Sequence, residues 1–92
     1  MSRKTFFSPD QVETVAERLG VRWDKFDRQQ FRDGMAVELE HGTRHPTTNV
    51  TNDDLLLTAK IALAHLTEFP DYYTRLAKME KDARSFWDSK AS

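Results

Sequence analysis

Apolar residues near the start of the chain recur three and four positions apart, which is the spacing of one face of an α-helix. The first such stripe consists of Val12, Val15, Ala16 and Leu19. Ser8 precedes it as a cap, Pro9 stands at the first helical position, and the side chain of Gln11 can complete a capping box. Gly20 follows as a stop signal. The pattern predicts a helix over residues 9–19.

A second stripe predicts another helix that begins after Asp27 and ends at Gly42. The stripe consists of Phe31, Met35 and Leu39. Gln30 stands at the capping-box position, and Phe26 and Phe31 stand at the spacing of a hydrophobic staple. Gly34 lies inside this helix, where glycine costs about 1 kcal/mol relative to alanine. A close approach by another helix would explain why glycine occupies that position.

A loop over residues 43–50 separates these helices from the second half of the chain. We expect Thr51 to cap a third helix over about residues 52–68, with Val50 and Leu55 as a staple. Two apolar strips run along it: Leu55, Ala59, Ala62, Leu66 and Phe69 on one side, and Leu57, Ile61 and Ala64 on the other. A helix that is apolar on two sides packs on two sides. This helix should therefore be the central element.

A fourth helix is predicted from about Pro70 to Trp87. Its expected inward face consists of Tyr72, Leu76, Met79, Ala83, Phe86 and Trp87. Residues 1–7 and 88–92 are expected to be flexible tails of a single domain over residues 1–92. No stretch alternates apolar and polar residues as a strand does. The predicted fold is therefore all-α, a compact bundle of about four helices around the third.

Composition narrows the class of protein. With 92 residues the chain can form one hydrophobic core but not two. The 14 basic and 15 acidic residues give a net charge of −1, which disfavours binding to the phosphate backbone of a nucleic acid. Cysteine is absent, so disulfides, thiolate metal sites and cysteine nucleophiles are excluded. Without a signal peptide or membrane-length apolar run, we expect a soluble protein, cytoplasmic or phage/virion-associated and not secreted.

Two Glu/His pairs form the most suggestive group of ionisable residues. Glu38 and His41 lie three apart on the second helix, and His65 and Glu68 lie three apart on the third, so each pair shares a helix face. Helical bundles that bind two metal ions use such pairs, and Glu80 could add a ligand. Iron, manganese or zinc would suit these ligands.

The same residues also have a structural interpretation. The second pair runs in reversed order, His before Glu, and a complete dinuclear site needs about six ligands where four or five can be placed. His41 would then interact with the C-terminal helix dipole. His65 would be a packed histidine that bonds Glu38.

A weaker signal suggests nucleic-acid binding through residues 9–41. Ala16 and Gly20, followed by a second helix, have the spacing of helix-turn-helix proteins. The base-reading candidates would then be Gln29, Gln30 and Arg32. The connection between the two helices is longer than a tight turn and contains Trp23, and the net charge argues against this interpretation.

An aromatic corner at residues 69–73 (FPDYY) joins the third and fourth helices. It is either a packed corner or, with Tyr72, Tyr73 and Trp23, a contact surface for another protein. Nucleophilic catalysis finds no support, because the chain has no cysteine, no Gly-x-Ser-x-Gly turn and no phosphate-binding glycine loop. Metal-assisted chemistry is the only enzymatic route that the residues allow.

Two segments, residues 38–42 (ELEHG) and residues 60–80, resemble a small family of bacterial and phage proteins known only as a domain of unknown function. Its members carry an EHG segment and a later HLxExPxYYxxLxxME segment. The resemblance covers about residues 8–82 and implies a stand-alone helical domain without implying an activity. The matching positions include Glu38, His41, His65, Glu68 and Glu80. A fold-defining polar network would give the same match as a metal site.

The leading functional hypothesis is a non-catalytic interaction domain that binds a protein partner or a second copy of itself. The alternative is a metal-binding domain built on Glu38, His41, His65 and Glu68. Nucleic-acid binding is the third hypothesis.

Overall fold

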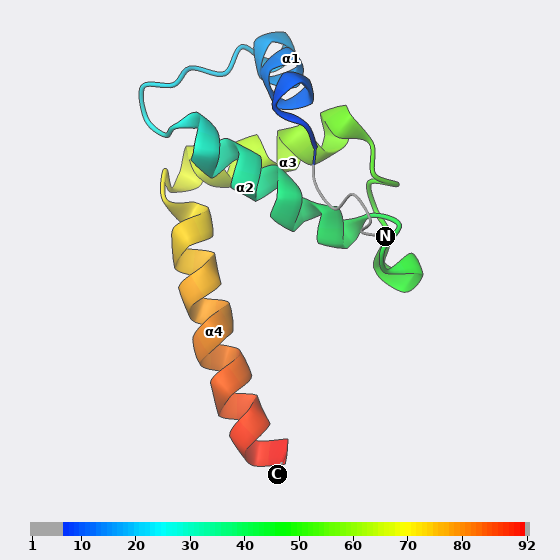
Figure 1. Ribbon diagram of the computed structural model, residues 1–92, viewed down its shortest axis with the longest axis vertical. Helices are drawn as coiled ribbons and strands as arrows, with labels where there is room; N and C mark the ends of the chain where they lie inside the picture. The colour runs from blue at the N-terminus through cyan, green and yellow to red at the C-terminus, as the bar shows by residue number, and fades with distance from the viewer. Residues whose placement is uncertain (1–6, 92) are drawn as a thin grey trace.

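The computed structural model describes residues 7–91, and within them the chain forms four α-helices (Figure 1). They are α1 (Pro9–Leu19), α2 (Arg28–Glu38), α3 (Leu55–Glu68) and α4 (Tyr72–Ala91), with two short 3₁₀ helices, η1 (Leu39–His41) and η2 (Pro46–Thr48), after α2. The predicted all-α fold is confirmed. The predicted tail over residues 1–7 lies outside the described residues except for Phe7, which is half-buried against the core.

The start and end of α1 follow the predicted capping pattern. The Gln11 N–H donates to Ser8 Oγ at 3.1 Å, and the Ser8 N–H donates back to Gln11 Oε1 at 2.9 Å. Gly20 ends the helix with φ 68°, a left-handed conformation that glycine adopts without strain. The predicted capping box and the predicted bounds of this helix are confirmed.

The start of α2 differs from its predicted pattern in one respect. Asp27 caps it, because Asp27 Oδ1 accepts from the Gln30 N–H at 2.9 Å. The predicted capping box is wrong, since the Gln30 side chain instead accepts from the Tyr73 N–H at 3.1 Å and donates to Thr74 Oγ1 at 3.3 Å. Gln30 therefore joins the first turns of α2 and α4. The α-helix itself ends at Glu38, and η1 continues the chain to Gly42.

The third helix begins later than predicted. Asn52 and Asp53 have φ values of 54° and 62°, and residues in this left-handed conformation cannot belong to a right-handed helix. The cap is Asp54, whose Oδ2 accepts from the Leu57 N–H at 2.8 Å. The predicted cap, Thr51, is buried in the loop instead. The predicted staple is also wrong, since Val50 is 75% exposed.

Asp53 holds the loop before α3 together. Its carboxylate accepts from the hydroxyl of Thr43 at 2.6 Å and from the Thr43 N–H at 2.9 Å. These two hydrogen bonds, the hydroxyl's first, lower the pKa of Asp53. Gly42 makes room for the carboxylate, because a Cβ at this position would overlap Asp53 Oδ1 and lie 3.1 Å from the Asp53 nitrogen.

We therefore expect Gly42→Ala to loosen this loop. The added methyl group would push Asp53 away from Thr43, and we expect the Tm to fall by about 5 °C. Thermal unfolding followed by circular dichroism measures the change. Thr43→Ala is the companion variant, since it removes the hydroxyl without crowding the loop. A Tm of Gly42→Ala equal to that of the wild type would contradict this account.

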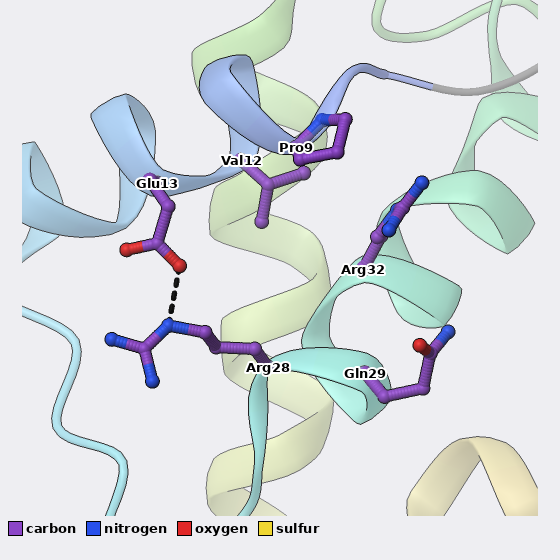
Figure 2. A pocket seen from close by; sticks show the side chains of 6 residues that line it. All are labelled: Pro9, Val12, Glu13, Arg28, Gln29 and Arg32. Carbon is purple, nitrogen blue, oxygen red and sulfur yellow. Dashed lines mark hydrogen bonds and ion pairs between the residues drawn. The ribbon is translucent and has the colours of Figure 1, made fainter.

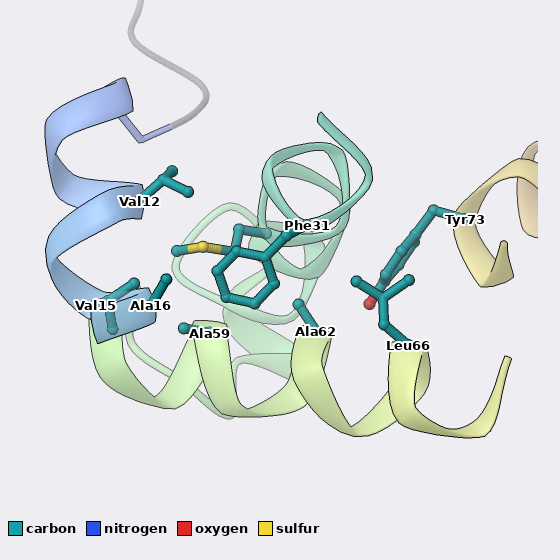
Figure 3. Packing of buried hydrophobic residues seen from close by; sticks show 9 residues of the cluster. Val12, Val15, Ala16, Phe31, Ala59, Ala62, Leu66 and Tyr73 are labelled. Atoms are coloured by element: carbon teal, nitrogen blue, oxygen red, sulfur yellow. The ribbon is translucent and has the colours of Figure 1, made fainter. Parts of the chain in front are cut away.

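The core lies where α1, α2 and the first turn of α4 meet α3. Figure 3 shows side chains from all four helices pointing toward one another. The buried cluster consists of Val12, Val15, Ala16, Phe31, Met35, Ala59, Ala62, Leu66 and Tyr73. Because α3 contacts each of the other three helices, its predicted central position is confirmed. The predicted staple before α2 is also present, with the rings of Phe26 and Phe31 stacked at 6.3 Å between centroids.

Gly34 lies where Tyr73 of α4 packs onto α2. A Cβ at this position would lie 2.8 Å from Cδ2 and 2.9 Å from Cζ of Tyr73, and closer still to Cε2. Carbon atoms in proteins do not approach so closely, so only glycine admits the tyrosine ring. The predicted reason for a glycine inside this helix is confirmed, and the approaching residue is Tyr73.

The outer part of α4 departs furthest from the sequence prediction. The helix continues to Ala91, through residues expected to form a polar tail, and runs away from the other three helices (Figure 1). Leu76 is half-buried against the core, but Met79, Phe86 and Trp87 are 55%, 53% and 66% exposed. The predicted inward face is therefore wrong beyond Leu76, because no described element lies opposite it. None of the described helices is long and apolar enough to cross a membrane.

Candidate functional site

A buried carboxylate, Glu38, stands at the centre of the predicted ligand set. It ends α2 and is 4% exposed. Tyr73 donates its hydroxyl hydrogen to Glu38 Oε2 at 2.7 Å. His65 Nε2 lies 3.6 Å from the same oxygen, and His41 Nε2 lies 3.7 Å from Oε1. Residues from α2, η1, α3 and α4 therefore meet at this one carboxyl group.

Aromatic stacking fixes the position of His65. Its ring lies parallel to that of Tyr72, with centroids 4.2 Å apart, and edge-on to that of Tyr73. On its other side, His65 Nδ1 is 3.9 Å from Glu68 Oε1, an exposed carboxylate. The imidazole thus spans the distance between a buried and an exposed acidic group.

The structure brings two of the other four predicted ligands, His41 and His65, to within 4 Å of Glu38, whereas Glu68 contacts the opposite ring nitrogen of His65. The fifth, Glu80, lies further along α4 and forms an ion pair with Arg84 at 3.6 Å. Within residues 7–91, no group of three or more histidine, aspartate and glutamate side chains has a geometry that could hold a metal ion. Tyr73, which the sequence placed on an interaction surface, supplies the shortest polar contact of Glu38.

The spacing on α2 gave only a partial signal for the role of Tyr73. Gly34 and Glu38 are four residues apart, so they share one helix face. A ring that packs on Gly34 therefore reaches Glu38 with its polar end. The sequence showed the glycine and the glutamate but gave no register between α2 and α4.

Burial raises the pKa of the Tyr73 hydroxyl well above its usual value of 10.0, and the hydrogen bond to Glu38 raises it further. The unfolded chain loses this proton near pH 10, whereas the folded chain keeps it. Above pH 10 the unfolded state therefore binds fewer protons, and stability falls as pH rises.

We expect this tyrosine to lower the free energy of unfolding by about 1.4 kcal/mol for each pH unit above 10. Urea unfolding at several pH values between 8 and about 11.5 measures the slope. Tyr73→Phe should remove this contribution, while Tyr72→Phe is the control that leaves the buried hydroxyl in place. Equal slopes for the wild type and Tyr73→Phe would contradict the account.

The residues of the nucleic-acid hypothesis occupy different environments. Gln29 and Arg32 line a small pocket of about 120 Å³ between the starts of α1 and α2, with Pro9 and Val12 (Figure 2). Gln30 is bonded to the first turn of α4 instead. Both α1 and α2 pack mainly on α3.

Two further side chains close this region. Arg28 bonds Glu13 across the pocket, as Figure 2 shows, and its guanidinium carbon lies 4.7 Å from the centre of the Trp23 ring. Trp23 in turn packs edge-on against Phe26 and Phe31. The connection between α1 and α2 is thus tied to the core by its aromatic residues.

The three residues of the predicted aromatic contact surface are covered to different extents. Tyr73 is 5% exposed. Tyr72 and Trp23 are half-buried, the first on His65 and the second beside Phe31. They lie on separate parts of the fold, since Trp23 precedes α2 and the tyrosines begin α4.

The outer part of α4 carries an apolar surface that is more exposed than Trp23, Tyr72 and Tyr73. We define the outer face as Met79, Ala83, Phe86 and Trp87, which follow Leu76 at helical spacing. The rings of Phe86 and Trp87 pack edge-to-face with centroids 5.1 Å apart. Along the rest of the helix surface, Lys78 pairs with Asp82 at 3.1 Å and Glu80 pairs with Arg84 at 3.6 Å. The helix thus has an exposed apolar face beside charged side chains that pair within the helix.

Comparison with known proteins supports the resemblance noted in the sequence. No curated protein and no solved structure matches the chain. A family model described as "Protein of unknown function (DUF5661)" matches residues 12–82. This range includes the residues around Glu38 and ends between Met79 and Phe86 of the outer face. The chain therefore belongs to this family of proteins of unknown function.

Proposed function

We propose that this chain is a helical protein-interaction domain and that the outer face of α4 is its contact surface. The observation that carries the proposal is the exposure of three large apolar side chains on one helix: Met79, Phe86 and Trp87 are each more than half exposed. Single exposed apolar residues are common, but adjacent ones on a helix that leaves the core are typical of binding surfaces.

The spacing of the outer face favours a helix as the bound element. Leu76, Met79, Ala83 and Phe86 are separated by three, four and three residues. This is the spacing of the a and d positions of a coiled coil, in which side chains of one helix fill the spaces between those of another. An amphipathic helix laid along α4 would cover these residues in the same way.

The expected affinity is moderate. Complete burial of the three large side chains would remove roughly 400 Å² of surface from water, which corresponds to roughly 10 kcal/mol before any costs. Association itself costs an estimated 4–15 kcal/mol. The partner's covering surface contributes a similar amount, so roughly 20 kcal/mol less this cost leaves roughly 5–16 kcal/mol, a range that includes the micromolar dissociation constant that we expect.

The test compares two triple variants. The first, Met79→Gln/Phe86→Gln/Trp87→Gln, removes the outer face. The second, Val50→Gln/Leu57→Gln/Phe69→Gln, removes three other exposed apolar side chains that lie apart from it. Both should keep the wild-type helix content, since all six residues are exposed.

Each protein is immobilised and offered cell extract supplemented with the purified chain. We expect the wild type and the second variant to retain the same bound chains, and the first variant to lose them. Equal binding by all three proteins would show that the outer face is not the contact surface.

Metal binding at Glu38 is a second candidate, favoured by the two imidazoles that flank one buried carboxylate at 3.6 and 3.7 Å. A modest closure of His41 and His65 onto a shared ion would be needed. Titration with Zn²⁺, Mn²⁺ or Fe²⁺ tests it: a Tm that rises in the wild type but not in His65→Gln supports the site, and unchanged Tm values reject it.

A further inference from the structure

We infer that the partner of the outer face is the same face of a second copy of this chain, with the two α4 helices antiparallel. The inference rests on the proposed function, since it names the occupant of the surface proposed there. Three features of α4 carry it: its charge balance, the order of large and small residues, and the position of the other helices.

The charge balance of the helix suits a second copy. Between residues 78 and 91, four basic residues (Lys78, Lys81, Arg84 and Lys90) alternate with three acidic ones (Glu80, Asp82 and Asp88). Two ion pairs within the helix, Lys78 with Asp82 and Glu80 with Arg84, neutralise much of this charge. Two such helices, each with a net charge of +1 over this segment, approach with little repulsion, whereas a strongly acidic or basic partner would find only a weak complementary field.

The sizes of the side chains favour the antiparallel orientation. Ala83 leaves a gap between Met79 and Phe86. Parallel helices would place Phe86 against Phe86 and Ala83 against Ala83, which crowds one layer and leaves the next one empty. Antiparallel helices can place Phe86 of each copy against Ala83 of the other, so large side chains fill the spaces beside small ones.

This register also keeps α1, α2 and α3 of each copy outside the contact between the two α4 helices. Pairing Ala83 with Phe86 aligns residue 78 of one copy with residue 91 of the other. The overlap extends over about 21 Å of helix. It involves only the part of α4 that runs away from α1, α2 and α3 (Figure 1). It leaves Leu76 in its place against the core.

Like charges are also separated in this register. Glu80 of one copy lies near Trp87 of the other. Shifting the helices by one heptad, so that Met79 lies opposite Ala83, would bring the two Glu80 residues and the two Asp82 residues close to each other. The sequence therefore distinguishes between the two antiparallel registers by charge.

Sedimentation velocity of the purified chain, from about 1 µM to 1 mM, tests self-association. We expect the wild type to convert from monomer to dimer over this range, because the predicted dissociation constant is micromolar. The Met79→Gln/Phe86→Gln/Trp87→Gln variant should stay monomeric, and the Val50→Gln/Leu57→Gln/Phe69→Gln variant should dimerise like the wild type. A dimer that survives the first variant would overturn the inference.

Disulfide cross-linking tests the orientation, and the absence of native cysteine makes single-cysteine variants unambiguous. The antiparallel register places Met79 opposite Lys90 of the second copy. A mixture of Met79→Cys and Lys90→Cys chains should therefore form a mixed disulfide on mild oxidation, while Met79→Cys alone should not cross-link. The reverse result, ready cross-linking of Met79→Cys with itself, would show parallel helices.

Self-association and binding by the outer face can be refuted separately. A wild-type chain that stays monomeric at 1 mM refutes the second copy as partner. If the capture experiment then still separates the two triple variants, the outer face binds another protein and the proposed function stands. If it does not separate them, both statements are wrong.

Discussion

Gly34→Ala is expected to lower the free energy of unfolding by about 2 kcal/mol, although alanine is the better helix former. Helix propensity alone predicts a gain of about 1 kcal/mol from this substitution. The added Cβ, however, would lie 2.8–2.9 Å from two carbons of the Tyr73 ring. Crowding of this kind typically costs 1–3 kcal/mol, and displacing the ring also breaks its hydrogen bond to Glu38. Urea unfolding at pH 7 measures the net change in the free energy of unfolding. A decrease shows that crowding outweighs helix propensity, and an increase shows the opposite.

Two controls separate crowding from other effects of removing a glycine. In Gly20→Ala the added Cβ would meet no atom within 4 Å, so any loss of stability comes from the φ of 68°. Asparagine tolerates this left-handed conformation better than alanine, so Gly20→Asn should lose less stability than Gly20→Ala. Introducing Gly34→Ala into a Tyr73→Ala background should be neutral or stabilising, because the ring that it meets is absent. If Gly34→Ala stabilises the wild-type chain, α4 does not pack on α2 as described.

Glu38→Ala is expected to have the larger effect, a loss of about 3 kcal/mol. The substitution removes one buried methylene group and the carboxyl group and leaves a cavity. It also leaves the buried hydroxyl of Tyr73 without its acceptor, which costs a further 1–3 kcal/mol. Glu38→Gln should lose less, since its amide oxygen can still accept from Tyr73. Urea unfolding of both variants at pH 7 gives the two values.

The same experiment, repeated with a chelator, distinguishes a structural cluster from a metal site. If Glu38 acts only through its hydrogen bond and packing, the loss in Glu38→Ala is the same with and without chelator. If the cluster holds an ion, chelator lowers the stability of the wild type and leaves Glu38→Ala unchanged. A stability of Glu38→Ala equal to that of the wild type would contradict both interpretations.

The sequence predicted helix ends well where they depend on hydrogen bonds between residues close in sequence. Ser8, Asp27 and Gly20 determine helix ends through bonds within four residues, and all three lie where the sequence placed them. The start of α3 was misplaced because both Thr51 and Asp54 are good caps. The choice depends on the left-handed conformations of Asn52 and Asp53, which the hydrogen bonds of Asp53 to Thr43 support.

The candidate site was predicted only in part, because some of its contacts are local in sequence and others are not. The i, i+3 pairs Glu38/His41 and His65/Glu68 follow from helix geometry alone. Their meeting at one carboxylate, and the part of Tyr73, depend on how α2 and α4 cross. That crossing follows from contacts such as Gln30 to Tyr73, which lie 43 residues apart in sequence and have no local signature.

The outer part of α4 illustrates a different limit of the apolar pattern. The spacing of Met79, Ala83 and Phe86 correctly predicts a helix with one apolar face. It does not say which surface covers that face, since a core helix and a helix that binds another chain follow the same period. In this protein the face lies beyond the reach of α1, α2 and α3, which is why the prediction of an inward face failed.

Coverage of the outer face of α4 by another α4 helix should change the surroundings of Trp87, which lies on that face. The chain has two tryptophans, so Trp23→Phe leaves Trp87 as the single fluorescent indole. Its emission is recorded as the protein concentration rises through the micromolar range. We expect a shift from the emission of an exposed tryptophan toward shorter wavelengths, and we expect Met79→Gln/Phe86→Gln to abolish this shift. Emission that stays at the exposed wavelength up to 1 mM would contradict the claim.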